Sequence, residues 1–308
     1  MTPAVQIRNV TKTYGAQAAV DDLSLDVPPG SVYGFIGPNG SGKTTTLRMI
    51  MRIIRPDRGD IEVLGQQSNS AILDRVAYLP EERMLYKQMR VYDVLRFFAR
   101  LKNHNPTLPE MDQWLDRLQL SGVGPRRVET LSKGMTQKVQ LIATLIAKPQ
   151  LVLLDEPFSG LDPVNAVVLR DTIIDLRRGG TTVIFSTHDM SVAERMCDFI
   201  FMIYKGGKVL DGTLESIQQK YGADVVRVRL ESGNGHAPSL EGLPGVVKIT
   251  DFGKLQELRL SAGTDRHALL SALMSRGKLV HFEQSHPSLQ DIFVRIASPD
   301  MKGETILA

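Results

Sequence analysis

The chain has 308 residues, of which 42% are hydrophobic and 23% are charged, and this composition is typical of a folded globular protein rather than a disordered or fibrous one. Two domains are expected at this length, because a domain usually has about 100 to 200 residues. The net charge is only +3 and Lys and Arg are scattered along the chain, so we expect no nucleic-acid partner.

Cysteine content and hydropathy indicate in which cellular compartment the chain is expected. Cys197 is the single cysteine, so no disulfide can form within the chain, which suits a reducing compartment. No window approaches the roughly 18 apolar residues of a membrane span, and the first 15 residues lack the pattern of a signal peptide. We therefore expect a cytoplasmic protein that does not itself cross a membrane.

A buried strand, a glycine-rich turn and a helix are predicted in succession from Ser31. The apolar run SVYGFIG predicts the strand. The segment TTTLRMIMRII follows the turn and places apolar residues at helical spacing from Leu47 to Ile54, before Pro56. The order strand, turn, helix is the context in which a phosphate-binding loop is expected.

The turn itself has the sequence GPNGSGKTT, which fits the phosphate-binding pattern G-x-x-x-x-G-K-[ST]. Its glycines allow backbone N–H groups to turn towards phosphate oxygens, and the N-terminus of the following helix adds a positive dipole. Lys43 is predicted to reach the β and γ phosphates, and Thr44 to offer a hydroxyl to Mg²⁺. The nucleotide-binding residues expected in this loop are Gly37, Pro38, Asn39, Gly40, Ser41, Gly42, Lys43, Thr44 and Thr45.

The middle of the chain, about residues 86–148, is mostly helical by its pattern. Val91, Leu95 and Phe98 share one helical face, and later apolar residues share another. This pattern predicts a helical subdomain inserted between the strands.

Two further buried strands, LVLLD and TTVIFS, follow, with a helix from about Val164 to Arg178 between them that should stop at a glycine pair. Buried strands joined by helices imply a parallel sheet. The first of these strands ends at Asp155 and Glu156. On its own, such a pair is more often a solvated loop start or a helix cap. After a phosphate loop, the Asp can hold Mg²⁺ and the next carboxylate can reach the attacking water.

The sequence pattern changes after a hairpin predicted at Gly206 and Gly207. Alternating apolar residues, a loop rich in Gly and Pro, two more strand-like runs, a short helix and a last amphipathic segment predict a small α+β domain. We place the boundary near Tyr221, which divides the chain into domains 1–220 and 221–308. His281 and His286 lie in the second domain without clear partner ligands, so solvated loop residues are a better interpretation than metal ligands.

The motifs together resemble the ATP-binding cassette of ABC transporters over about residues 5–213. LSKGM resembles the family's signature loop, SGLD, which ends at Asp162, its D-loop, and STHD carries His188 at the position of the switch histidine. Tyr14 matches the adenine-stacking aromatic residue. The resemblance implies an α/β P-loop NTPase fold, with a RecA-like core, an antiparallel β-subdomain and the inserted helical subdomain, followed by the small α+β domain.

The resemblance also implies hydrolysis of MgATP at two composite sites in a dimer of cassettes, a homodimer being the simplest case. Lys43 and the loop amides would hold phosphate, Glu156 would polarise the attacking water, and His188 would contact the γ-phosphate. The implied catalytic residues are Lys43, Glu156 and His188. The implied metal ligands are Thr44, Glu81 and Asp155. Four more nucleotide-binding residues are implied. Tyr14 would contact the adenine, and Ser132, Gly134 and Asp162 would face the ATP that the second cassette holds.

Three positions depart from the family's pattern. Lys133 replaces a glycine of the signature loop, and Met135 replaces its glutamine. Glu81, in the run YLPEER, replaces a glutamine that contacts Mg²⁺ and water. A carboxylate can ligate Mg²⁺, but close to a γ-phosphate it adds like-charge repulsion, and a third alternative is that Glu81 only caps a helix or pairs with Arg83. We favour the metal contact.

The implied partner is a separate transmembrane permease, which would hold the cassette peripherally at the cytoplasmic face of the membrane. Docking is expected near the Glu81 loop and the helices that begin around Val91. The segment HPSLQDIFVRI resembles the extension of drug- and polysaccharide-exporting cassettes, which favours export over uptake.

Two alternatives to the transporter function stay open. One is a soluble ABC ATPase, and the other is a nucleotide-gated regulatory module with low turnover, which the three departures from the family's pattern suggest.

Overall fold

The computed structural model describes residues 2–67, 70–82, 85–221, 225–231, 239–253, 255–261, 263–285 and 287–297, so Arg83 and His286 lie outside the described residues. The chain divides into two compact units, Met1–Leu214 and Glu215–Ala308. The second unit begins at helix α8 (Leu214–Tyr221), whereas the sequence placed the boundary at the end of this helix. Among the described residues, no helix has both the length and the apolar content that a membrane span requires.

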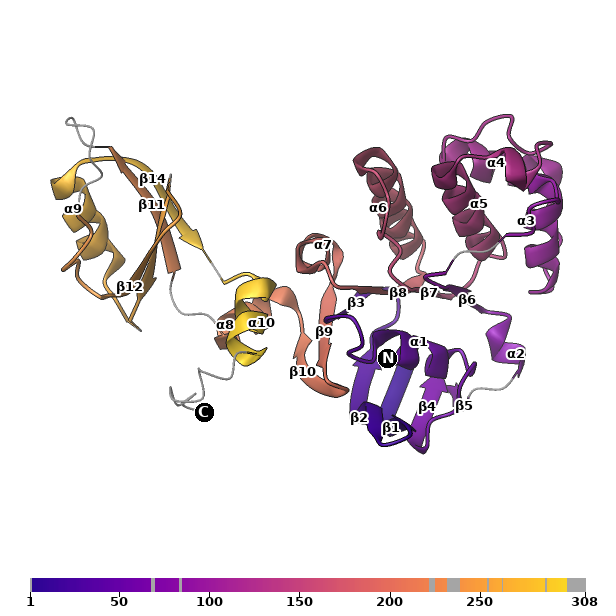
Figure 1. The fold of residues 1–308 in the computed structure, drawn as a ribbon, viewed down its shortest axis with the longest axis horizontal. Coiled ribbons are helices and arrows are strands. Elements are labelled where there is room, and N and C mark those ends of the chain that lie inside the picture. The colour runs from indigo at the N-terminus through magenta and orange to yellow at the C-terminus, as the bar shows by residue number, and fades with distance from the viewer. Residues whose placement is uncertain are drawn as a thin grey trace. The chain divides into compact units, whose positions relative to one another are not determined.

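The core of the first unit is a six-stranded sheet (Figure 1). Its strands are β3 (Val32–Ile36), β6 (Val76–Leu79), β7 (Leu151–Leu154), β8 (Thr182–Thr187), β9 (Phe199–Tyr204) and β10 (Gly207–Gly212). They lie in the order β10-β9-β3-β8-β7-β6, and all pairs are parallel except β10 with β9. Strands β3, β7 and β8 are buried along their whole length, as in parallel sheets that are covered on both faces. The predicted parallel sheet is confirmed.

The helices between these strands include the one that follows the phosphate loop. They are α1 (Lys43–Ile50), α2 (Ser70–Leu73), α6 (Pro163–Arg178) and α7 (Met190–Met196). Helix α1 is shorter than predicted from the apolar spacing, because it ends at Ile50 and Arg52 adopts a left-handed backbone with φ 56°. Ile54 still packs against the core from the turn after the helix, which explains why the spacing continues beyond the helix.

A second, antiparallel sheet of the first unit packs against α1. Its strands are β1 (Val5–Tyr14), β2 (Gln17–Val27), β4 (Arg58–Val63) and β5 (Gln66–Gln67), in the order β2-β1-β4-β5. Leu23 of this sheet, Leu47 of α1 and Phe201 of the main sheet belong to one buried cluster. Each such side chain stabilises the packing by about 1.5–3 kcal/mol, so the cluster fixes α1 between the two sheets.

The inserted helical subdomain lies at one end of the main sheet (Figure 1). It consists of α3 (Val91–Arg100), α4 (Leu108–Arg117), the short 3-10 helix η1 (Val128–Thr130) and α5 (Lys133–Leu145). Val91 and Leu95 are fully buried, and Phe98 packs against the same cluster. The predicted helical face therefore packs into a buried cluster that also contains Leu154 and Phe185 of the main sheet.

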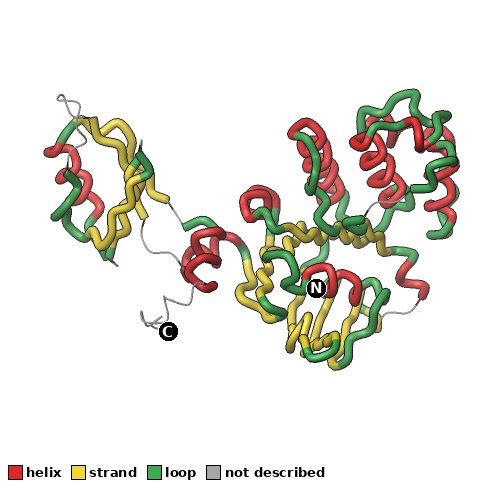
Figure 2. Tube along the Cα trace, viewed as in Figure 1, coloured by secondary structure: helices red, strands yellow, loops and turns green. Residues whose placement is uncertain are grey.

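The second unit is an antiparallel sheet with a helix on one face (Figure 2). After α8 come β11 (Val225–Glu231), β12 (Val246–Asp251), β13 (Gln256–Leu260), α9 (Arg266–Arg276), β14 (Lys278–Ser285) and α10 (Leu289–Ala297). The strand order is β12-β13-β11-β14. Val226, Val228 and Leu230 pack with Leu269 and Leu273 of α9. The sequence did not separate β14 from the last amphipathic segment, because this strand begins directly after the helix.

Candidate functional site

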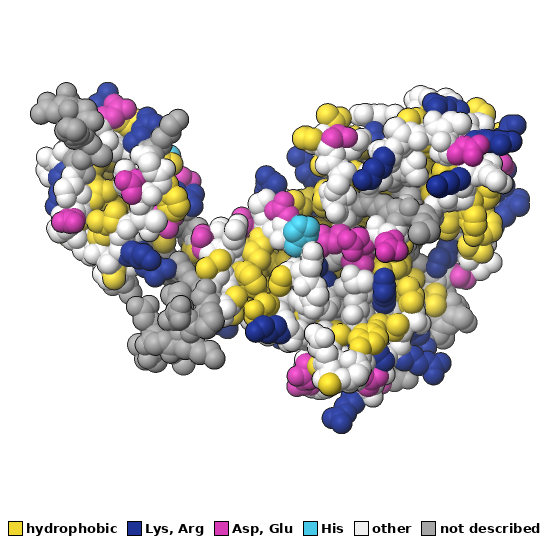
Figure 3. Space-filling view, in the orientation of Figure 1, with side chains coloured by type: hydrophobic (Ala, Val, Ile, Leu, Met, Phe, Trp, Pro, Cys, Tyr) yellow, Lys and Arg dark blue, Asp and Glu magenta, His cyan; other side chains and the backbone are white. Residues whose placement is uncertain are grey.

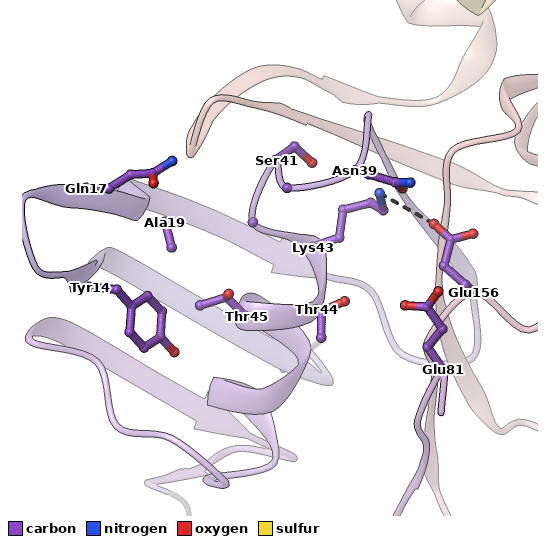
Figure 4. Close-up of a pocket in the computed structure, with 12 residues that line it drawn as sticks. Tyr14, Gln17, Ala19, Asn39, Ser41, Lys43, Thr44, Thr45, Glu81 and Glu156 are labelled. Atoms are coloured by element: carbon purple, nitrogen blue, oxygen red, sulfur yellow. Dashed lines mark ion pairs between the residues drawn. The ribbon is translucent and has the colours of Figure 1, made fainter. Parts of the chain in front are cut away.

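A pocket of about 500 Å³ lies at the N-terminus of α1 in the first unit. It is bounded by the hairpin between β1 and β2, by the loop between β3 and α1, and by acidic side chains that follow β6 and β7. Tyr14 lies at the opposite end of the pocket from Glu81 and Glu156 (Figure 4). The lining residues are Tyr14, Gln17, Ala19, Asn39, Gly40, Ser41, Gly42, Lys43, Thr44, Thr45, Glu81 and Glu156.

Two glycines allow the loop before α1 to turn closely over the sheet. A Cβ atom on Gly42, which has φ 113°, would lie 2.4 Å from the backbone oxygen of Ala19. A Cβ atom on Gly37 would lie 2.2 Å from the backbone oxygen of Ile203, so neither position accepts a side chain. The Nζ atom of Lys43 donates to the backbone oxygens of Gly37 at 2.7 Å and Pro38 at 3.1 Å. The lysine therefore lies across its own loop, and its ammonium group points towards the acidic end of the pocket.

Glu156 accepts contacts from two cationic or potentially cationic side chains. Nζ of Lys43 lies 3.4 Å from its Oε1, and Nδ1 of His188 lies 3.0 Å from its Oε2. Because an ionised carboxylate only accepts hydrogen bonds, Nδ1 of His188 must carry the hydrogen. Glu156 has φ 46°, a backbone conformation that costs a non-glycine residue about 1–3 kcal/mol. Its backbone N–H donates a hydrogen bond to Ser186 Oγ at 2.8 Å. Strain of this kind is typical of functional residues. Acidic side chains also gather beside a histidine on the face shown in Figure 3.

Asp155 lies behind the pocket, fully buried at the end of β7. Its Oδ1 accepts hydrogen bonds from Ser186 Oγ at 2.7 Å and Thr44 Oγ1 at 3.0 Å, and its Oδ2 accepts one from the Tyr78 hydroxyl at 3.3 Å. Burial, and then the charge of Asp155, raise the pKa of Tyr78 to about 12, against the opposing effect of Arg48. Carboxylate and hydroxyl oxygens are the ligands that hard divalent cations prefer, so Asp155 and Thr44 fit a Mg²⁺ ion.

The remaining predicted residues do not line this pocket. Ser132 caps α5 by accepting a hydrogen bond from the N–H of Met135, and Asp162 caps α6. The N–H of Asn165, which donates to Asp162, holds the pKa of that carboxyl below its usual value. A Cβ atom on Gly134 would lie 3.1 Å from Nδ2 of Asn165, so the loops that begin α5 and α6 are neighbours. Ser132, Gly134 and Asp162 thus form a second polar surface of the first unit, outside the pocket.

Four residues around the site were not found from the sequence. Gln17 and Ala19 line the pocket from β2, and only their closeness to Tyr14 along the chain could have suggested them. Ser186 is the first residue of the STHD run, and its position near the end of the buried strand β8 was a usable signal. Tyr78 gave no signal, because a tyrosine within an apolar strand reads as an ordinary packing residue.

Comparison with family models divides the chain in a similar way. The family described as "ABC transporter" matches residues 20–159. The family described as "ATP-binding protein DrrA1-3-like, C-terminal domain" matches residues 212–297. The first match contains the pocket loop, Asp155 and Glu156, and the second covers most of the second unit.

Similar proteins cover nearly the whole chain. An uncharacterized ABC transporter ATP-binding protein, YhaQ of Bacillus subtilis, is 38% identical over 94% of this chain and 96% of its own. The daunorubicin resistance ATP-binding protein DrrA3 of Streptomyces coeruleorubidus is 32% identical over 97% of both chains. The Nod factor export ATP-binding protein I of Cupriavidus metallidurans is 31% identical over 98% of this chain and 100% of its own. A solved structure of an ATP-binding subunit of an ABC transporter matches 71% of this chain and 93% of its own, with 28% identity and a TM-score of 0.65.

Proposed function

The chain belongs to the family of ABC transporter ATP-binding proteins, and from that premise we propose that it hydrolyses ATP to power export of a substrate through a separate membrane permease. Export is supported by relatives over nearly the whole chain that are named for daunorubicin resistance and for Nod factor export. The match of residues 212–297 to a DrrA-like C-terminal domain points in the same direction. Recognition of the substrate is assigned to the permease.

The observation that carries the ATPase proposal is the position of Glu156 at one end of the pocket, between Lys43 and His188. The amides of the phosphate loop and Lys43 would hold the phosphates, with Tyr14 against the adenine at the other end. Glu156 would then lie beside the γ-phosphate and polarise the attacking water, while His188 orients this carboxylate and contacts the γ-phosphate. These groups are in place within one chain.

Asp155 and Thr44 are proposed to hold Mg²⁺, and Glu81 is proposed as a third oxygen ligand. Figure 4 shows the Glu81 carboxylate turned into the same space as Thr44 and Glu156. Bound Mg²⁺ would neutralise charge that develops on the phosphate oxygens. Glu81 follows β6 and is the site's link to the loop that enters the helical subdomain.

A second copy of the chain is proposed as the partner that completes the site. Ser132 and Gly134, at the N-terminus of α5, and Asp162, at the N-terminus of α6, lie together outside the pocket of their own chain. A helix N-terminus offers backbone N–H donors to an anion. In a head-to-tail pair, these donors would contact the γ-phosphate of ATP held by the phosphate loop of the partner.

The permease is proposed to dock beside the Glu81 loop, at the cytoplasmic face of the membrane. Tyr86 and Phe97 are exposed by 57% and 37%, and their rings pack edge to face at 5.6 Å. Exposed aromatic residues are common at the centres of protein interfaces. Residues 221–308 are proposed to form an accessory domain that supports the dimer or regulates it.

The proposal is tested by the ATPase rate of the purified chain, with and without Mg²⁺. Steady hydrolysis that needs Mg²⁺ and falls in Glu156→Gln supports it. ATP binding without measurable hydrolysis would instead favour the regulatory module with low turnover. The observations behind that alternative are the three departures from the family's pattern. Lys133 and Met135 stand in the surface proposed to face the partner's γ-phosphate, and Glu81 stands in the pocket.

A further inference from the structure

The carboxylate of Asp155 is held by hydroxyl groups from three different elements. Ser186 stands on β8 and Thr44 on α1, and both donate to Oδ1. Tyr78 stands on β6 and donates to Oδ2. Strands β6 and β8 flank β7, whose end carries Asp155, so the sheet itself supplies a donor from each side.

We propose that Tyr78 is a positioning residue of the metal site, and that its hydroxyl fixes the orientation of the Asp155 carboxylate towards Mg²⁺. This inference rests on the proposed function, which assigns Mg²⁺ to Asp155 and Thr44. An ionised carboxylate only accepts hydrogen bonds, so the Tyr78 hydroxyl is the donor. A residue that orients a metal ligand in this way affects metal affinity without touching the metal.

The geometry explains why a donor on Oδ2 matters. The Thr44 hydroxyl can donate its hydrogen to Oδ1 of Asp155 while a lone pair faces the metal, because a hydroxyl has one donor and two acceptor sites. Thr44 and Ser186 both hold Oδ1, and Tyr78 holds Oδ2. A donor on each oxygen prevents rotation of the carboxylate about its Cβ–Cγ bond, whereas donors on Oδ1 alone would leave that rotation open.

The helix of the phosphate loop also reaches Tyr78 and Asp155. Arg48, on α1, opposes the rise in the pKa of the Tyr78 hydroxyl. Helix α1 begins with Lys43 and Thr44, and the hydrogen bond from Thr44 joins this helix to the same Asp155 carboxylate. Phenylalanine at position 78 would keep the ring packing of Tyr78 but lose the hydrogen bond to Asp155.

A second tyrosine provides a matched control. Tyr33 donates to Oδ1 of Asp211 at 2.7 Å, which is also a pairing of a phenol with a carboxylate in the first unit. Neither Tyr33 nor Asp211 lines the pocket or bonds to Asp155 among the described contacts. Tyr33→Phe therefore removes the same chemical group from a structural position.

The experiment measures binding of a fluorescent, non-hydrolysable ATP analogue to the full chain, once with excess Mg²⁺ and once with EDTA. The ratio of the two dissociation constants reports how much Mg²⁺ contributes to binding. In Tyr78→Phe we expect this ratio to fall by about 3- to 10-fold, at the lower end of effects for groups that orient metal ligands because the 3.3 Å contact is long. The affinity in EDTA should stay at the wild-type value, and Tyr33→Phe should leave the ratio unchanged.

Three results would overturn the inference: an unchanged ratio in Tyr78→Phe, an equal loss of affinity with Mg²⁺ and with EDTA, or the same fall in Tyr33→Phe. A wild-type chain that binds equally with Mg²⁺ and EDTA would contradict the proposed metal site itself, which separates the two failures.

Discussion

Lys43 and Glu156 form a buried ion pair, with Nζ of Lys43 3.4 Å from Oε1 of Glu156 and side chains that are only 5% and 8% exposed. The pair joins the phosphate loop to the end of β7. Glu156 also reaches His188 through its other oxygen. A change at Glu156 should therefore separate the binding of phosphate, which needs Lys43, from the reaction with water, which needs the carboxylate.

Glu156→Gln should bind ATP and Mg²⁺ but hydrolyse ATP at least about 100-fold more slowly than the wild type. The amide keeps the shape of the side chain and an oxygen for Lys43, but it cannot serve as the base. Single-turnover hydrolysis and nucleotide titration measure the two effects separately. Glu82→Gln, at an exposed acidic residue that does not line the pocket, is the control. An unaltered rate in Glu156→Gln would remove Glu156 from this role.

The phosphate loop could be predicted because its glycines, Lys43 and Thr44 are contiguous in the sequence, so one short pattern contains the whole constraint. The surroundings of Asp155 could not, because Tyr78 and Ser186 come from separate strands that only the sheet brings together. The sequence around a tyrosine in a strand looks the same whether the tyrosine hydroxyl donates to a metal ligand or to water. The prediction of where α1 ends was wrong for another reason. Ile54 is apolar and packs against the core, although it lies beyond the helix.

Glu81→Ala should raise the Mg²⁺ concentration that gives half of the maximal ATPase rate by about tenfold, if the carboxylate contacts the metal. Glu81→Gln should change this concentration only modestly, because an amide oxygen is also a hard ligand. ATPase rate against Mg²⁺ concentration for the three proteins measures the effect. If repulsion from the γ-phosphate dominates instead, Glu81→Gln should tighten ATP binding. Superimposable curves for the wild type and Glu81→Ala would exclude Glu81 from the site.

A mixture of Lys43→Ala and Ser132→Arg chains should recover ATPase activity that neither variant has alone. The pocket of the Ser132→Arg chain keeps its lysine, and the Lys43→Ala chain keeps its signature loop, so a mixed head-to-tail dimer has one intact site. If chains pair at random in an equal mixture, half of the dimers are mixed and about a quarter of all sites are intact.

Activity of the mixture is measured against each variant at the same total concentration, and mixed dimers are detected with two different affinity tags. A mixture of Lys43→Ala with a Lys43→Ala, Ser132→Arg double variant is the control, because no intact phosphate loop is present. Mixed dimers without any gain in activity would argue against sharing of the site between chains.

Removal of the second unit should leave nucleotide binding intact, and the position of the cut should matter. A chain that ends at Leu214 keeps β10, which pairs with β9 and completes the main sheet. A chain that ends at Tyr221 also keeps α8, but α8 lies beside α10, and Nε2 of Gln218 donates to the backbone oxygen of Pro287. Ile217, on the same helix, is only 3% exposed in the full chain. The longer fragment therefore retains a helix whose partner is missing.

Both fragments should bind ATP with the affinity of the full chain, because every residue that lines the pocket lies before the cut. The fragment that ends at Tyr221 should aggregate more readily, since loss of its partner exposes apolar surface on α8. Nucleotide titration and light scattering during heating measure the two outcomes, and circular dichroism checks that each fragment is folded. A folded fragment 1–214 with weakened ATP binding would show that the second unit contributes to the nucleotide site. Equal aggregation of the two fragments would show that α8 does not depend on the segment around Pro287.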